Sequence, residues 1–174
     1  MNPTLRKLAN LLLVAGSTLA FSACGAAPSA TPVPAPAADT TATAAPTEAL
    51  PVVHVHKDAN CGCCNGWIEH MRAAGFTVVP HDSDDMAAVK QRLGIPLSQA
   101  SCHTAEIGDY VVEGHVPVED VQRLLREKPA ARGLLLPGMP IGSPGMESMD
   151  GYRQPFTVTL LDEDGTVQPY SEHP

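Results

Sequence analysis

Four consecutive residues, Cys61-Gly62-Cys63-Cys64, separate a strand-like segment from a helix-like one, and they constrain the fold more than any other feature. Residues 52–56 are typical of a strand, and residues 65–74 carry apolar side chains at helical spacing before Gly75. A Cys-x-x-Cys pair where the first helix begins is typical of thioredoxin-like folds. We therefore expect Cys61 in the loop after the first strand and Cys64 at the start of the helix.

The remaining segments continue the alternation of strands and helices. They are a strand over 76–81, a helix from Asp84 or Asp85 to Leu93, a strand pair over 104–112, a helix over 118–128, a Gly/Pro/Met-rich loop over 134–151, and a hairpin over 156–161 and 166–170. The order β-α-β-α-β-β-α predicts an α/β, thioredoxin-like domain that is followed by this loop and a C-terminal hairpin.

The first 24 residues have the pattern of a secretory signal. A charged start is followed by an apolar stretch over 8–21, which is short for a membrane-spanning helix, and small residues then precede Cys24. Small residues before a cysteine resemble the lipobox of bacterial lipoproteins. We therefore expect export to the periplasmic or cell-surface side, with a lipid on Cys24 as the membrane contact. Ordinary signal cleavage near the same place is the alternative.

Residues 25–51 are almost entirely Ala, Pro, Thr and Ser, a composition that predicts a disordered tether. The folded domain is then expected over 52–174. The chain has 19 Asp+Glu against 11 Lys+Arg, a formal net charge of −8. So acidic a chain is not expected to bind nucleic acid through a basic face.

The thiols of the domain are the strongest functional signal. Amides at a helix N-terminus favour the thiolate form, which either attacks disulfides or binds metal. A dithiol enzyme needs Cys61 and Cys64 but not Cys63, so the third thiol favours metal binding. Cys102 precedes the third strand, in a loop expected to face the cysteine turn. A static disulfide with a spare cysteine is the plainer alternative.

Methionine and histidine extend the candidate ligand set. Met139, Met146 and Met149 lie in a Gly/Pro-rich loop, where core packing explains them poorly, and thioethers are neutral soft ligands that suit Cu(I). His115 follows the expected strand pair, near the cysteine face. His103, beside Cys102, and Met149 are further candidates.

With these motifs assembled, the chain resembles a family of exported, cysteine-rich bacterial copper-resistance proteins called CopG. The resemblance rests on five motifs, which are Cys61-Gly62-Cys63-Cys64 with Trp67, Ser101-Cys102-His103-Thr104, Glu113-Gly114-His115-Val116-Pro117, Pro137-Gly138-Met139-Pro140 and Gly142-Ser143-Pro144-Gly145-Met146-Glu147. It implies a thioredoxin-like fold, copper binding through cysteines and a role in periplasmic copper tolerance. The residues carried over are the four domain cysteines, His115, Met139 and Met146.

The sequence therefore predicts a copper-binding resistance or homeostasis protein rather than a conventional enzyme. We expect Cu(I) in a thiolate-bridged site of more than one ion, with cycling between Cu(I) and Cu(II) left open. Copper ions and other periplasmic copper proteins are the expected partners. The alternatives are a thiol–disulfide oxidoreductase that uses Cys61 and Cys64, and a zinc or structural module.

Overall fold

The computed structural model describes residues 49–174 of the chain. The expected signal peptide over 1–24, the lipidated Cys24 and all but the last three residues of the tether over 25–51 lie outside the described residues. Within the described part, no helix is long and apolar enough to cross a membrane.

The described residues form a mixed α/β structure, and its elements follow the predicted order. They are β1 (Val53–Lys57), α1 (Gly62–Ala73), β2 (Val78–Asp82), α2 (Met86–Arg92), a 3-10 turn (Leu97–Gln99), β3 (His103–Ile107), β4 (Tyr110–Glu113), α3 (Val118–Glu127), β5 (Ala131–Leu135), β6 (Phe156–Asp162) and β7 (Val167–His173). The α/β class, the order of elements up to α3 and the C-terminal hairpin are confirmed.

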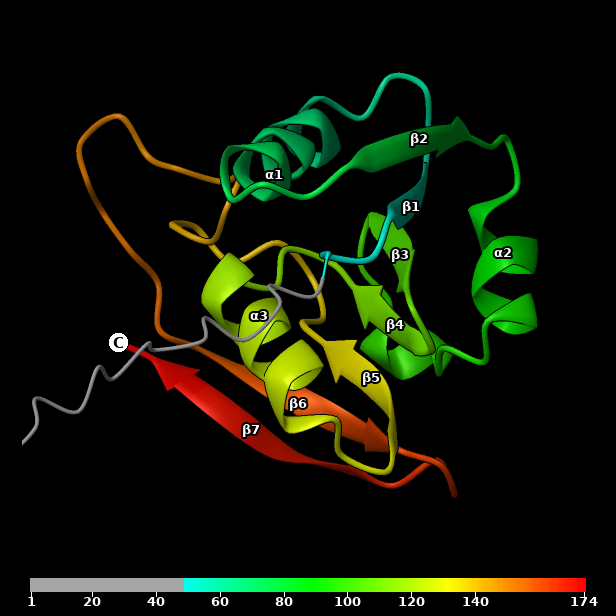
Figure 1. Ribbon diagram of the computed structural model, residues 1–174. Coiled ribbons are helices and arrows are strands. Elements are labelled where there is room, and N and C mark those ends of the chain that lie inside the picture. Colours follow the sequence, from blue (N-terminus) through cyan, green and yellow to red (C-terminus); the bar gives the residue numbers. More distant parts are fainter. Residues whose placement is uncertain (1–48) are drawn as a thin grey trace, which may run out of the picture. The chain divides into compact units, whose positions relative to one another are not determined.

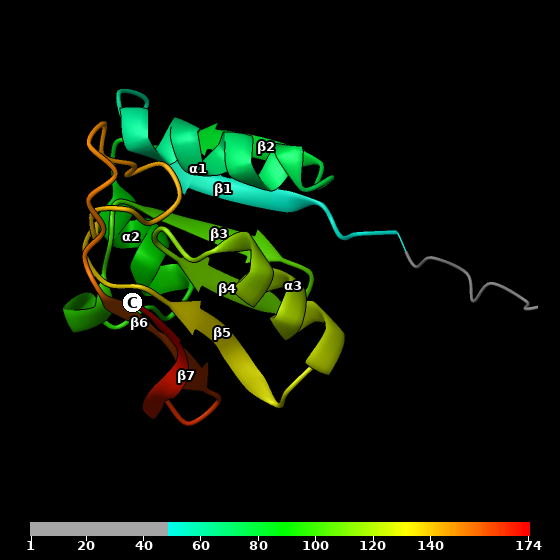
Figure 2. The same ribbon diagram turned by 90° about the vertical axis from the view of Figure 1, so that its left-hand side faces the viewer.

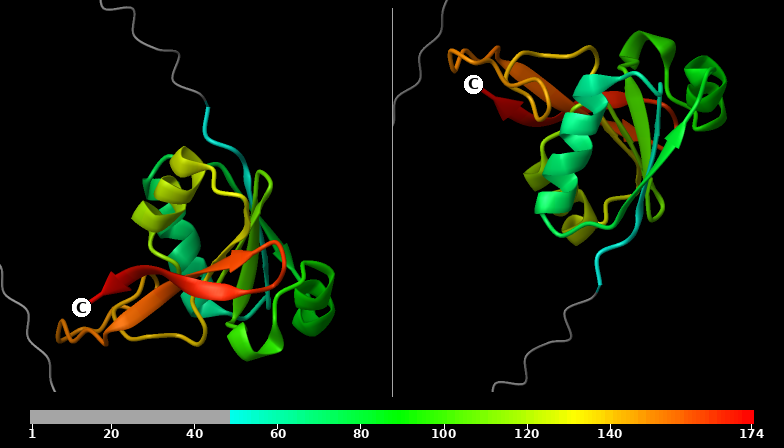
Figure 3. Two further views of the ribbon diagram at one scale, coloured as in Figure 1. Left: turned by 90° about the horizontal axis from the view of Figure 1, so that it is seen from below. Right: turned by 90° about the horizontal axis from the view of Figure 1, so that it is seen from above.

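All seven strands belong to one sheet in the order β2-β1-β3-β4-β5-β6-β7 (Figure 1). The β1–β2 and β4–β5 pairs are parallel, and the other neighbours are antiparallel. Helices α1 and α3 cover one face of this sheet, and α2 lies on the other (Figure 3).

Each face of the sheet buries its own apolar cluster. The larger cluster lies under α1 and α3 and includes Val53, Val55, Trp67 and Leu124. A smaller cluster around Leu93, Ile95, Leu135 and Leu161 lies on the α2 side. Burial of a large aliphatic side chain contributes roughly 1.5–3 kcal/mol, so these two clusters hold the layers together.

Two boundaries differ from the sequence prediction. The predicted loop over 134–151 was wrong at its start, because Leu134 and Leu135 belong to β5 and are fully buried. Leu134 and Leu135 therefore belong to a central strand, the buried Leu136 follows it, and the loop begins only at Pro137. Helix α1 begins at Gly62, three residues earlier than expected, so Cys63 and Cys64 lie in its first turn.

Candidate metal centre

The cysteine turn joins the end of β1 to the start of α1. Cys61 is the N-cap residue of α1, and its backbone N–H donates to the carbonyl oxygen of Asp58 at 3.0 Å. Cys61 and Cys64 are joined by a disulfide, while Cys63 is a free thiol. The turn therefore places three sulfur atoms at a helix N-terminus, where the backbone amides favour negative charge.

Cys102 adds a fourth sulfur from the segment before β3. Its Sγ lies 3.3 Å from Cys64 Sγ and 3.9 Å from Cys63 Sγ, and Cys61 Sγ lies 3.5 Å from Cys63 Sγ. All four sulfurs lie within 4.8 Å of one another, and we call these residues the cysteine cluster. Two sulfurs bound to one ion at about 2.3 Å can be at most about 4.6 Å apart, so these three distances fit shared ligation.

His115 faces the cluster with an unprotonated nitrogen. Its Nδ1 donates to the carbonyl oxygen of Pro144 at 2.8 Å, which leaves the Nε2 lone pair 3.0 Å from Cys102 Sγ. Burial lowers the pKa of His115, so the ring is neutral near pH 7, and neutral imidazole is the form that binds metal. A Cys102 thiol hydrogen fills this contact in the metal-free protein, and a metal ion can replace it.

His103 lies deeper in the same place. It is fully buried between Trp67 and His115, its Nδ1 is 3.4 Å from Cys102 Sγ, and burial lowers its pKa well below the ordinary value. Its Nε2 has no hydrogen-bond partner within the described residues. A buried polar atom without a partner is uncommon, so the second donor set of Cys102, His103 and His115 fits a ligand.

The Cys102 thiol itself is strongly held in its protonated form. Burial and, secondarily, the neighbouring Cys63 raise its pKa to about 12. A metal cation must therefore displace a proton from Cys102, and binding at this sulfur will release that proton.

Of the three loop methionines, the structure links only Met139 to the cluster. Met139 Sδ lies 3.9 Å from Cys63 Sγ, and Met139 is half exposed. Met146 is partly buried, but within the described residues its sulfur makes no polar contact with a cysteine. Met149 is fully exposed. The site residues predicted from the sequence thus converge, apart from Met146 and Met149.

Residues 137–155, which we call the methionine loop, run beside the start of α1 (Figure 2). The loop is seated by close backbone contact, since a Cβ on Gly66 would lie 2.8 Å from the Cα of Gly145. Gly145 itself has a φ of +84°, a conformation that glycine adopts readily. Ser101 donates from its hydroxyl to the Gly138 carbonyl, which ties the loop to the Cys102 segment as well.

A buried charge network supports the Cys102 segment, and the sequence analysis missed it. Glu113 is fully buried and accepts from Lys90 Nζ at 2.6 Å, from Thr104 Oγ1 at 2.6 Å and from the Ser101 backbone N–H at 2.5 Å. The sequence feature that could have indicated this network is an acidic residue at the end of the otherwise apolar segment Val111-Val112-Glu113. Because the carboxylate holds the residue before Cys102, it fixes where that sulfur lies.

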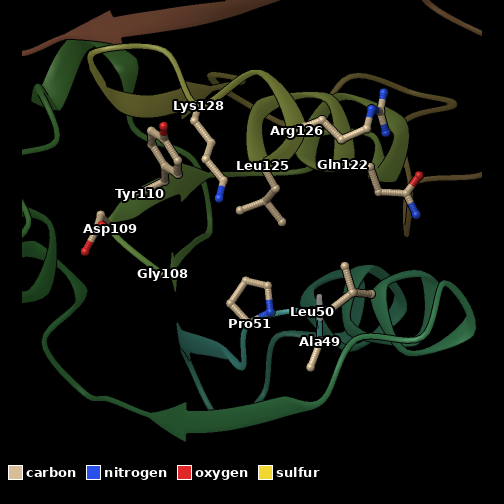
Figure 4. Close-up of a pocket in the computed structure, with 10 residues that line it drawn as sticks. All are labelled: Ala49, Leu50, Pro51, Gly108, Asp109, Tyr110, Gln122, Leu125, Arg126 and Lys128. Carbon is tan, nitrogen blue, oxygen red and sulfur yellow. The ribbon is translucent and has the colours of Figure 1, made fainter. Parts of the chain in front are cut away.

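A groove elsewhere on the domain shares no residue with the cysteine cluster. It lies between residues 49–51, the β3–β4 turn and α3, and Leu50, Tyr110 and Leu125 contribute much of its lining (Figure 4). Its lining offers no thiol or imidazole. The four thiols that could hold a metal ion therefore lie outside this groove.

The fold and site define a class of protein, an α/β domain with a cysteine-rich centre whose donors can hold a metal ion. Residues 99–146 match the family described as protein of unknown function, DUF411. Two solved structures, both described as copper resistance protein CopG, are similar over the folded part. Form 2 is 47% identical with a TM-score of 0.68, covering 72% of this chain and 99% of that one. Form 1 is 48% identical with a TM-score of 0.67, covering 71% and 98%.

The chain belongs to this DUF411 family of CopG-type copper resistance proteins, as the sequence resemblance predicted. A search among curated proteins gives no match.

Proposed function

We propose that the protein binds Cu(I) through Cys61, Cys63, Cys64, Cys102 and His115, with Met139 as a neutral soft donor. The observation that carries this proposal is the convergence of four sulfurs within 4.8 Å. Thiolate and thioether ligands select Cu(I), whereas zinc sites use cysteine and histidine. The Met139–Cys63 contact therefore favours copper over the zinc or structural alternative.

The donor sets support more than one copper ion. Four thiolates form one set, and Cys102 also belongs to the set with His103 and His115. A four-coordinate ion uses four ligands, and the two sets together offer six. Cys102 thiolate is then the bridging ligand between ions in a small cluster. His103, whose Nδ1 lies 3.4 Å from Cys102 Sγ, is the further ligand of this arrangement, while Met146 and Met149 are peripheral to it.

The disulfide controls how many ligands are available. In the oxidised domain only Cys63 and Cys102 are thiols, and reduction of Cys61–Cys64 by two electrons and two protons adds two more. We therefore expect the reduced protein to bind more Cu(I) than the disulfide form. Competition with a Cu(I) chelator, on protein before and after dithiothreitol treatment and desalting, measures both capacities.

Cys63→Ser is the sharpest test of the proposal. It removes the thiol that a Cys61–Cys64 redox pair does not use, so copper capacity should fall while the disulfide still forms. Cys24→Ser is the matched control, because Cys24 lies outside the domain and its loss should leave the capacity unchanged. Unchanged copper capacity in Cys63→Ser, with insulin disulfide reduction retained, would contradict copper binding as the main role.

One observation favours a second function, thiol–disulfide exchange. The Cys61–Cys64 disulfide lies at a helix N-terminus, and free thiols stand 3.5 Å from Cys61 Sγ and 3.3 Å from Cys64 Sγ. Sulfurs this close can undergo thiol–disulfide exchange within the protein. An insulin reduction assay with Cys61→Ser and Cys64→Ser tests this, and catalysis lost in both variants would support it.

For the whole chain we propose a role in copper resistance or homeostasis outside the cytoplasm, with Cys24 as the lipid anchor. The similar structures described as copper resistance proteins support the role, and the signal-like residues 1–24 support the location. The partners are copper ions and other exported copper proteins. Fractionation of cells that express wild type or Cys24→Ser tests the anchor, and membrane association should be lost in the variant.

A further inference from the structure

Two exposed histidines face each other on neighbouring strands, on the sheet face opposite the larger core. His54 lies on β1 and His81 on β2, and His54 Nδ1 is 3.0 Å from His81 Nε2. The alternation of β1 explains the placement, because Val53 and Val55 are buried and the side chain between them points the other way. We call His54 and His81 the histidine pair.

A third histidine holds the pair in place. His56 stacks on the ring of His81, with centroids 5.0 Å apart, and its own Nε2 lies 2.8 Å from Glu106 Oε1. Arg92 on α2 approaches the same carboxylate at 3.4 Å. The Glu106 carboxylate therefore anchors the His56 ring. Stacking on this ring orients the His81 side chain.

We propose that His54 Nδ1 and His81 Nε2 form a binding site for Cu(II), separate from the cysteine cluster. Two metal–nitrogen bonds of about 2.0–2.1 Å that span 3.0 Å subtend an angle of roughly 95° at the metal. That angle is close to the 90° between neighbouring ligands of tetragonal Cu(II) and well below the tetrahedral angle that zinc prefers. Both side chains are exposed, so small ring rotations can aim both nitrogens at one ion.

The donor chemistry separates this site from the sulfur site. Imidazole nitrogen with water in the open positions suits Cu(II), whereas the thiolates and the thioether of the cysteine cluster suit Cu(I). The two sites therefore sort the oxidation states of one metal between two places on the domain. Cu(II) binding at the histidine pair does not rest on the proposed Cu(I) function, because it uses none of the residues assigned there, whereas the sorting of oxidation states does rest on it.

The test is a Cu(II) titration of the full chain with the cysteine cluster blocked. Alkylation with iodoacetamide, without reduction and continued until mass spectrometry shows that the slowly reacting Cys102 is capped, blocks the free thiols and leaves the Cys61–Cys64 disulfide intact. We expect His54→Gln and His81→Gln each to weaken Cu(II) binding by at least tenfold. His70→Gln, which removes another exposed histidine, is the matched control and should leave the affinity within twofold. His56→Phe keeps the stacking ring and should also retain binding.

Electron paramagnetic resonance of the Cu(II) complex provides a second readout that does not depend on affinity. The hyperfine pattern should show two histidine nitrogens, and it should show one in either single variant. Affinities in His54→Gln and His81→Gln within twofold of wild type would overturn the proposal. So would a weakening equal to that of His70→Gln, or a wild-type spectrum without a second imidazole.

Discussion

The cysteine cluster and the histidine pair are built in opposite ways. The cluster collects side chains from the β1–α1 turn and from the segment before β3, about forty residues later, and buried groups support it. The histidine pair lies on two adjacent strands and is exposed, and the parallel register sets His56 opposite His81 with His54 as the diagonal neighbour of His81. A long-range site depends on tertiary packing far from its ligands, whereas a site on two paired strands depends mainly on local pairing.

This difference predicts how each site responds to substitution. Substitution of a residue that supports the cluster should lower the free energy of unfolding and should also displace the sulfur atoms from their positions. Changes at the exposed pair should leave stability within about 0.5 kcal/mol, as surface substitutions usually do.

Lys90→Met should have the largest effect on stability. It leaves the Glu113 carboxylate buried without its cation, and breaking a buried ion pair by removing one partner typically costs about 3–5 kcal/mol. Urea unfolding of the metal-free protein measures the loss. His54→Gln is the comparison, and an equal loss in both variants would refute the contrast between the two regions.

Gly66→Ala should displace the methionine loop. A Cβ at this position would meet the Gly145 backbone at 2.8 Å, and forcing an extra methyl into a packed contact costs about 1–3 kcal/mol. Cu(I) affinity should fall as Met139 moves away from Cys63. Gly62→Ala is the stability control, because its Cβ would meet nothing within 4 Å. Equal stability of the two variants would show that the Gly66–Gly145 contact does not seat the loop.

The Cys102 thiol should be slow to alkylate in the folded, metal-free domain. Its pKa is raised from 9.0 to about 12, so very little thiolate is present at pH 8. We expect iodoacetamide to react at least about tenfold more slowly than in the urea-unfolded chain, and the rate to rise steeply with pH. Peptide mass spectrometry follows the residue.

The raised pKa of Cys102 also makes the stability of the domain depend on pH. The unfolded chain loses the Cys102 proton at a lower pH than the folded domain does. The stability that the protonated thiol contributes is therefore fully present below pH 9 and is lost as the pH rises from 9 toward 12. A Cys102→Ser variant should lose less stability than wild type over that range. A folded-state alkylation rate equal to the unfolded one would contradict the raised pKa.

The methionines should give the smallest and most selective effect. Met139→Leu removes the thioether beside Cys63 while nearly keeping its volume, so Cu(I) affinity should fall several-fold with little change in stability. Met146→Leu should have a smaller effect, and Met149→Leu none, because Met149 is fully exposed. A chelator titration ranks the three, and equal affinities would mean that Met139 merely packs.

Much of the architecture could be predicted from local patterns. Helical spacing placed α1 and α3, and Asp85 caps α2 through the Ala88 N–H, as one of the two alternatives anticipated. Leu134 and Leu135 were misassigned because a short apolar run after a glycine does not by itself distinguish a central strand from a packed loop. Pairing of β5 with β4 and β6 settles it.

The ligand residues of the candidate site could be predicted from the sequence, but the residues that hold them in place could not. Cysteine spacing and the soft-ligand composition mark the sulfur residues in the sequence itself. The Glu113–Lys90 pair joins β4 to α2 across 23 residues, and no local pattern connects them. Likewise, three loop methionines look alike in sequence, and only packing brings Met139 rather than Met149 to the cluster.

The sequence by itself determined the chemistry of this protein, since side-chain type decides which metals a residue can bind, and strand and helix periodicity determined the order of its elements. Tertiary structure decided which donors meet. Sulfurs of Cys64 and Cys102 come within 3.3 Å because β1 and β3 pair in one antiparallel register. His54 and His81 meet as diagonal neighbours because the parallel pairing of β1 and β2 sets His56 opposite His81. Distances between residues far apart in the chain arise from strand pairing and packing, which act only once the chain has folded.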